Sequence, residues 1–161
     1  MEQICSTNTK QNIEENDTLN IAFFITPKKD VVCETPNSTM RQALERMEEH
    51  RYTAIPLIDK FGKYVGTLTE GDLLWKLKNT PDLNFKNTSK VILKDIPRHM
   101  NNKPVSINSD MKDLISIAVN QNFVPVVDDN DIFIGIIKRS DIINYCYEEI
   151  FKNQKNDDVK K

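Results

Sequence analysis

The sequence predicts an α/β (α+β) fold made of two pseudo-symmetric β-α-β-β-α halves that pack together through their sheets. Three observations lead to it: an apolar block that occurs twice, an amphipathic helix pattern ahead of each copy, and a strand–turn–helix pattern behind each copy. Residues 54–59 (AIPLID) match residues 123–128 (FVPVVD), and Gly66 and Asp72 match Gly135 and Asp141, all at an offset of 69 positions. The block therefore superposes on its copy without a gap.

The elements of the first half follow from local signals. A short strand at 31–33 leads into a helix with apolar residues at 40, 43, 44 and 47, and Thr39 with Gln42 can form a capping box at its start. Strands are expected at 54–58 and 64–68, separated by the Phe61-Gly62 turn. A second helix then carries apolar residues at 73, 74 and 77.

The second half repeats this order with a two-residue deletion after its first helix. A short strand at 105–107 precedes a helix that Asp110 can cap, with apolar residues at 111, 114, 115 and 118. Strands are expected at 123–127 and 132–137, and the last helix has apolar positions at 142, 143, 146, 147 and 150. About 45 ordered residues are too few to bury a sheet alone, so the halves should pack as one unit.

These signals divide the chain into five parts. Residues 21–80 form the first repeat, 81–97 a linker and 98–152 the second repeat. The polar segments 1–20 and 153–161 show no sustained periodicity, so we expect both to be disordered tails.

Composition excludes several functional classes. With 22 Lys and Arg against 24 Asp and Glu, a net charge of -2 gives no field that would attract nucleic acid or an anionic membrane. Three cysteines without a C-x-x-C spacing argue against disulfides and structural zinc, and no apolar run approaches a membrane span of roughly 18 residues. We expect a cytoplasmic, soluble protein without a metal site. His50 and His99 stand alone, and no catalytic motif is present, so we expect no enzyme activity.

The segment from Gly66 to Asp72 has two interpretations. Thr69 and Asp72 can form a capping box at the start of the helix. Alternatively, the same helix start can bind a nucleotide, with free N–H groups and Thr69 at a phosphate and Asp72 at the ribose hydroxyls.

In the second half, Lys138-Arg139-Ser140-Asp141 occupies the equivalent turn. Two cations at a helix start oppose the helix dipole by roughly 0.3–1 kcal/mol each, which a bound phosphate would relieve. The alternative is a pair of charges simply exposed to solvent.

Pro56 and Pro125 lie at the same point of two apolar strands, where a missing N–H is tolerated at a sheet edge. Free backbone groups at residues 53–54 and 123–124 could then read the edge of an adenine, while the proline ring covers its face. The alternative is that these are ordinary edge strands.

The repeated h-P-h-h-D and G-h-h-T-x-x-D pattern resembles the CBS (cystathionine β-synthase) domain, here as a tandem pair or Bateman module over about residues 21–152. The resemblance implies clefts between the repeats that bind adenosine-containing ligands, and a homodimer. By this resemblance, Asp72 and Asp141 are expected to bind the ribose, and Thr69 is expected to contact the phosphate. Lys138 departs from the Thr/Ser of the family, so the second cleft could prefer a polyphosphate, contact part of a ligand or stay empty.

Residues 51–56, 94–98 and 133–136 are also similar to stand-alone bacterial CBS-pair proteins, some of which bind cyclic di-AMP. This likeness implies a regulatory module that binds cyclic di-AMP, AMP, ADP or ATP and signals in trans to a separate protein effector. The alternative is a structural or dimerisation adaptor with vestigial clefts. The predicted ligand-binding residues are Val32, Thr53, Ala54, Pro56, Thr69, Asp72, Phe123, Val124, Pro125, Lys138, Arg139 and Asp141.

Overall fold

The computed structural model describes residues 20–158, with side chains described through residue 151. Residues 1–19 of the expected N-terminal tail lie outside this range. In chain order the elements are η1 (Ile21–Phe24), β1 (Thr26–Pro27), η2 (Lys28–Asp30), α1 (Met40–His50), β2 (Ala54–Ile58), β3 (Tyr64–Thr69), α2 (Glu70–Asn79), η3 (Thr88–Lys90), η4 (Leu93–Asp95), β4 (Val105–Ser106), α3 (Met111–Ala118), β5 (Phe123–Val127), β6 (Phe133–Lys138) and α4 (Arg139–Asp158).

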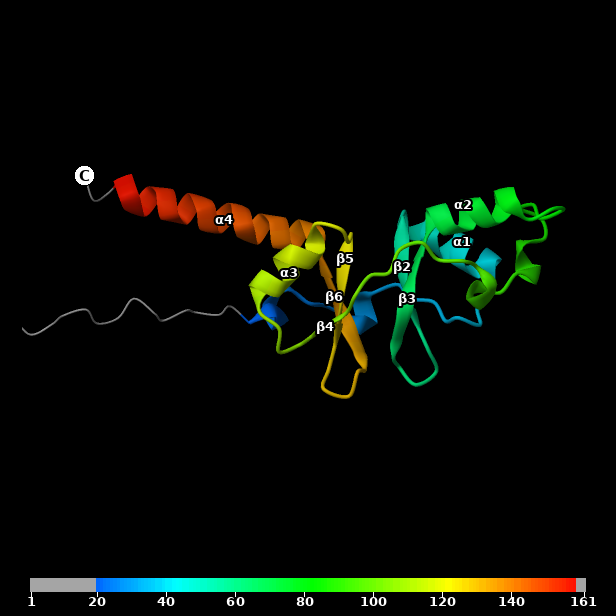
Figure 1. Ribbon diagram of the computed structural model, residues 1–161, viewed down its shortest axis with the longest axis horizontal. Helices are drawn as coiled ribbons and strands as arrows, with labels where there is room; N and C mark the ends of the chain where they lie inside the picture. The colour runs from blue at the N-terminus through cyan, green and yellow to red at the C-terminus, as the bar shows by residue number, and fades with distance from the viewer. Residues whose placement is uncertain (1–19, 159–161) are drawn as a thin grey trace, which may run out of the picture.

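Two antiparallel hairpins, β2–β3 and β5–β6, lie side by side at the centre of the molecule, with α1 and α2 at one end and α3 and α4 at the other (Figure 1). The hairpin tips are joined by a hydrogen bond from the Phe133 N–H to the Gly62 carbonyl, 2.9 Å long. The rings of Tyr64 and Phe133 stack across the same junction, with their centroids 6.4 Å apart. The predicted pair of halves packed through their sheets is thus confirmed.

The helix starts predicted from the sequence are also present. Thr39 and Gln42 form a reciprocal capping box at α1, and Asp110 forms one with Asp113 at α3. Each box satisfies two backbone N–H groups that would otherwise lack a partner at the helix end.

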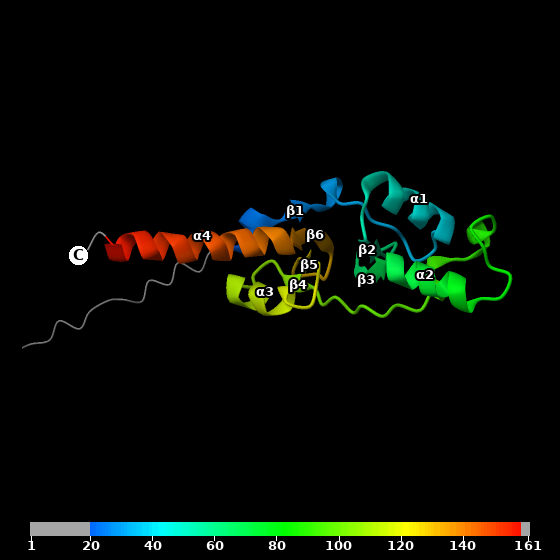
Figure 2. The ribbon, with the colours of Figure 1, turned by 90° about the horizontal axis from the view of Figure 1, so that it is seen from above.

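The boundaries between the halves differ from the prediction. The segment that precedes the first half packs in the core of the second half, and the segment that precedes the second half packs in the core of the first. Ile21 is fully buried in the core of the second half, and β1 pairs with β6 there. Leu93 and Ile96, assigned to a linker, are buried in the core of the first half. Figure 2 shows these two crossing segments on opposite sides of the central hairpins.

Gly135 explains why β1 can lie so close to β6. A Cβ on Gly135 would be 2.3 Å from the Thr26 carbonyl oxygen and 2.7 Å from the Ile25 Cγ2. Only a residue without a side chain leaves room for this approach. The repeated glycine of the sequence pattern therefore has a packing role in this half.

Two further expectations are corrected. The strand expected at 31–33 is replaced by a single parallel bridge between Glu34 and Leu57, while the strand expected at 105–107 is present as β4, which pairs in parallel with β5. Residues 153–158, expected to be a disordered tail, continue α4, whose range contains no glycine or proline to end it. Within residues 20–158, no helix is long and apolar enough to cross a bilayer.

Candidate functional site

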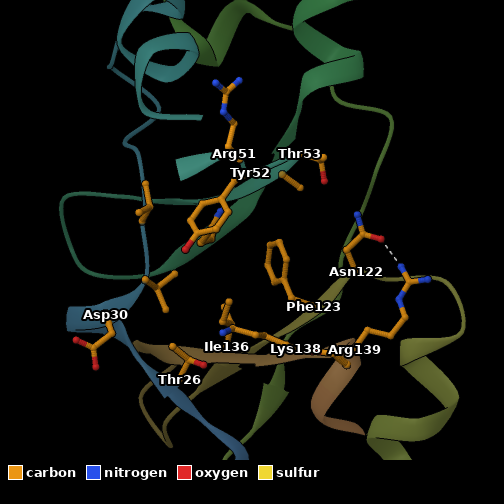
Figure 3. Close-up of a pocket in the computed structure, with 15 residues that line it drawn as sticks. Thr26, Asp30, Arg51, Tyr52, Thr53, Asn122, Phe123, Ile136, Lys138 and Arg139 are labelled. Atoms are coloured by element: carbon orange, nitrogen blue, oxygen red, sulfur yellow. Dashed lines mark hydrogen bonds between the residues drawn. The ribbon is translucent and has the colours of Figure 1, made fainter. Parts of the chain in front are cut away.

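A hollow of ≈ 460 Å³ opens between the two halves (Figure 3). This volume lies within the range of about 300–1,000 Å³ that is typical of small-molecule sites. We call it the open cleft, and it is lined by Thr26, Asp30, Val31, Val32, Arg51, Tyr52, Thr53, Ala54, Pro56, Asn122, Phe123, Ile136, Lys138, Arg139 and Ser140.

The open cleft has a cationic wall at the start of α4. Lys138 is exposed at the end of β6, and Arg139 is the first residue of the helix. The Arg139 Nε donates a 2.9 Å hydrogen bond to the Gln121 carbonyl, and its terminal amino group donates to Asn122 Oδ1. The guanidinium is therefore held in place at a helix N-terminus, where cations are unfavourable unless an anion binds beside them.

Arg51 lines the cleft from the first half, with its side chain directed away from Lys138 and Arg139 (Figure 3). It ends α1 in the left-handed conformation, with φ of 57°, and its backbone N–H bonds to the last carbonyls of that helix. This sharp turn directs the next two residues, Tyr52 and Thr53, to the rim of the cleft (Figure 3).

The backbone of Ala54 forms an unpaired edge inside the cleft. The Glu70 N–H donates to the Thr53 carbonyl at 3.0 Å, so Thr53 and Glu70 are a hydrogen-bonded pair of the β2–β3 ladder. Because such pairs alternate along an antiparallel ladder, the N–H and C=O of Ala54 point away from β3. On that outer side the one partner of β2 within residues 20–158 is Glu34, whose N–H donates to the Pro56 carbonyl. The Ala54 donor and acceptor thus face the cleft, whereas the Thr53 carbonyl, also expected to be free, accepts from Glu70.

Two aromatic rings border this edge. Tyr52 is 45 % exposed and stacks on His50 with ring centroids 5.5 Å apart. Phe123 lies opposite and also points into the hollow (Figure 3). Flat apolar faces beside a free backbone edge can hold a planar heterocycle.

Most of the predicted ligand residues meet in this cleft. Val32, Thr53, Ala54 and Pro56 come from the first half, and Phe123, Lys138 and Arg139 from the second. Arg51, Tyr52 and Asn122 also line the cleft and were not predicted. They could have been predicted from their position in the sequence, because each lies one to three residues before a residue that was expected to have free backbone groups.

Three predicted residues lie near the cleft without lining it. Val124 is fully buried and Pro125 is buried in β5. Asp141 lies in the first turn of α4, next to the lining residue Ser140. Among the described residues, no donor forms a hydrogen bond with the Asp141 carboxylate.

Thr69 and Asp72 are not brought to the open cleft. They form a capping box at α2, in which the Thr69 N–H donates to Asp72 Oδ2 at 2.9 Å and the Asp72 N–H donates to Thr69 Oγ1 at 3.1 Å. Asp72 is 2 % exposed, and its Oδ1 accepts from the His99 N–H at 3.1 Å. Of the two interpretations of this motif, the capping role is the one that the structure shows.

With this geometry established, the fold is a tandem pair of similar halves with a cleft between them, and the chain belongs to the CBS domain family. The family model matches residues 22–79 and 93–148, more than half of the chain.

Two curated proteins are similar in sequence to most of the chain. An uncharacterized protein of Methanopyrus kandleri is 28% identical over 120 residues, covering 72% of this chain and 58% of the relative. The chloroplastic CBS domain-containing protein CBSX1 of Arabidopsis thaliana is 26% identical over 149 residues, covering 76% of this chain and 62% of the relative. The chain thus spans about three fifths of the length of these relatives.

Solved structures share the fold. A CbpB protein in complex with c-di-AMP superposes with a TM-score of 0.73 at 18% identity, covering 86% of this chain and 91% of that one. Listeria monocytogenes CbpB, also in complex with c-di-AMP, superposes with a TM-score of 0.71 at 17% identity, covering 82% of this chain and 98% of that one. CBSX2 in complex with AMP gives 0.63 at 23% identity, covering 80% and 96%.

Proposed function

We propose that this protein is a non-catalytic regulatory module that binds an adenine nucleotide in the open cleft. The observation that carries the proposal is the free N–H and C=O edge of Ala54, which faces the cleft opposite the cations Lys138 and Arg139. CBS-pair proteins are generally regulatory modules, and neighbours of the same fold are solved with c-di-AMP and with AMP.

The adenine base would be recognised by hydrogen bonds to the backbone rather than by charged side chains. The Ala54 carbonyl can accept from the 6-amino group of adenine, and the Ala54 N–H can donate to a ring nitrogen. Tyr52 and Phe123 would flank the base, and Val32 would cover its apolar side. A guanine places a carbonyl oxygen where adenine has its amino group, so it would face the Ala54 carbonyl with an acceptor.

The phosphate would bind at the start of α4. Arg139 is already oriented by Gln121 and Asn122, and Lys138 adds an exposed cation beside it. Asp141, whose carboxylate has no partner among the described residues, is placed within one helical turn to accept the ribose hydroxyls. We therefore assign the ribose role to Asp141 and not to Asp72.

Signalling would proceed through a homodimer that a separate protein partner recognises. Both outer helix pairs expose apolar side chains, including Leu74 and Trp75 on α2 and Ile143 and Tyr147 on α4. Exposed apolar clusters of this kind are typical of interaction surfaces. Arg51 and Tyr52 line the open cleft and also the groove between α1 and α2, so a ligand would contact residues that border such a surface.

The test is titration calorimetry of the purified protein with AMP, ADP, ATP, cyclic di-AMP and a GTP control. We expect heat of binding with at least one adenine ligand and none with GTP. At a free ligand concentration of about 100 times the Kd, binding should also raise the free energy of unfolding by roughly 2.7 kcal/mol. If no adenine ligand binds, the proposal fails and the adaptor role is left.

A further inference from the structure

The open cleft has a counterpart on the other side of the molecule, because the two halves are related by the repeat. At the offset of 69 residues, Gln121 replaces Tyr52 and Phe123 replaces Ala54. The leading segments align through their equivalent pairings, Glu34 with Leu57 and Val105 with Val126. Lys103 therefore stands where Val32 stands in the open cleft.

The Gln121 side chain fills this counterpart. Its Oε1 accepts from the Lys103 N–H at 2.7 Å, and its Nε2 donates to the carbonyls of Lys103 and Phe123, each at 3.3 Å. The Asn102 amide adds a 3.4 Å bond to the Phe123 carbonyl. Gln121 and Asn102 are 6 % and 2 % exposed. The Phe123 carbonyl, the equivalent of the free Ala54 carbonyl, is thus covered twice.

A primary amide and the amidine edge of adenine present the same pair of groups, an acceptor beside an NH₂ donor. The Gln121 NH₂ group donates to the Phe123 carbonyl, the equivalent of the Ala54 carbonyl that would accept from the 6-amino group of adenine. Its oxygen accepts from the Lys103 N–H, at the position that Val32 holds in the open cleft. The side chain replaces the base in its own half of the molecule.

The segment that closes the counterpart is fixed at both ends. The His99 N–H is bonded to the buried Asp72 carboxylate at 3.1 Å. The Tyr64 hydroxyl donates to the Asn102 carbonyl at 3.0 Å and also bonds Thr67 Oγ1 at 2.8 Å. The phosphate wall is missing as well, because Glu70 occupies the position of Arg139.

We propose that residues 99–103 together with Gln121 act as a built-in occupant of the counterpart cleft, so that each chain binds a single nucleotide. This inference rests on the proposed function for its stoichiometry, but the closure itself is a property of the ligand-free chain. Gln121 is then the residue that determines which cleft is available.

The first experiment measures closure without any nucleotide. Hydrogen exchange followed by NMR should show the Lys103 and His99 amides protected in the free protein. The nearly isosteric variant Gln121→Glu keeps an acceptor for Lys103 but cannot donate to the two carbonyls, so Lys103 protection should fall by roughly five- to tenfold. Unprotected amides in the wild type would overturn the proposal, even if no nucleotide binds at all.

The second experiment counts ligands by equilibrium dialysis. The wild type should bind one adenine nucleotide per chain, and Tyr52→Gln, which places the closing amide in the open cleft, should weaken binding by about tenfold or more. Tyr52→Phe is the matched control and should bind normally. Two nucleotides per chain in the wild type would overturn the closure, whereas no binding by the wild type would overturn only the proposed function.

Discussion

Asp72 and His99 are joined across 27 residues, with the His99 N–H donating to Asp72 Oδ1 at 3.1 Å and the His99 Nδ1 lying 3.3 Å from the same oxygen. The carboxylate that caps α2 therefore also anchors the chain where it enters the second half. A residue with the sequence signature of a ligand contact here ties two parts of the fold together.

Replacing Asp72 by alanine should lower stability without changing nucleotide affinity. The variant loses the cap and the bond to His99, so we expect a loss of about 1–3 kcal/mol in the free energy of unfolding, measured by urea denaturation. Asp141→Ala is the matched control, for which we expect the opposite result: nearly normal stability and weaker nucleotide binding. Weaker binding in Asp72→Ala under conditions where it is fully folded would return the ribose role to Asp72.

Arg139→Ala should reduce nucleotide affinity by about tenfold or more, because one charged hydrogen-bonding group contributes roughly 1.5–3 kcal/mol. Titration calorimetry gives the affinity, and Lys90→Ala removes an exposed cation outside the cleft as a control. The loss should shrink with rising salt concentration, since the phosphate contact is partly screened. Equal affinities for the two variants would remove Arg139 from the site.

Gly135→Ala should be strongly destabilising, whereas Gly71→Ala should be tolerated. A methyl group at Gly135 would lie 2.3 Å from the Thr26 carbonyl and would force β1 away from β6. At Gly71, in the first turn of α2, the nearest atom would be 3.6 Å away, an ordinary contact. We expect a loss of about 1–3 kcal/mol for Gly135→Ala and a small gain for Gly71→Ala in thermal unfolding. Similar melting temperatures would contradict the tight approach of β1.

Cys33 should react slowly with alkylating reagents at pH 8. Burial raises the pKa of its thiol from 9.0 to about 11, an effect that the nearby Lys28 only partly offsets. Because the thiolate is the reactive form, labelling followed by mass spectrometry should be much slower in the folded protein than in urea. Equal rates in both states would show that the thiol is not shielded.

The same pKa shift makes stability depend on pH in the alkaline range. The unfolded chain releases the Cys33 proton near pH 9.0, while the folded protein holds it to about 11. The folded state binds more protons between these values, so this contribution to stability is complete below pH 9.0 and declines as the pH rises toward 11. Cys33→Ser should flatten this part of the stability profile in urea unfolding.

The sequence predicted the repeated parts of the fold well, because they depend on local signals. The capping box at Thr39 and the position of Pro56 in β2 followed from spacing alone, whereas Pro125, also expected at a sheet edge, lies in β5 between β6 and β4. The crossing of Ile21 and Leu93 to opposite halves was not predicted. Short apolar segments carry no information about which of two similar cores they will enter.

The sequence predicted part of the lining of the open cleft, but not which of the two clefts is open. Ala54, Lys138 and Arg139 were assigned correctly to the lining, whereas Thr69 and Asp72 were placed in a cleft that the chain fills itself. The deciding difference is Gln121 in place of Tyr52, which alignment of the repeats exposes. Its meaning required the distances to Lys103 and Phe123, which no sequence pattern supplies.

The exchange of leading segments has a consequence for how the chain folds. A fragment that stops before Val91 lacks Leu93 and Ile96 of its own core, and a fragment that begins there lacks Ile21 and β1. Neither half is then a self-sufficient folding unit, and many native contacts join residues far apart in the sequence. The molecule should melt in a single cooperative transition, and two fragments divided in the 81–90 segment should regain structure only when mixed.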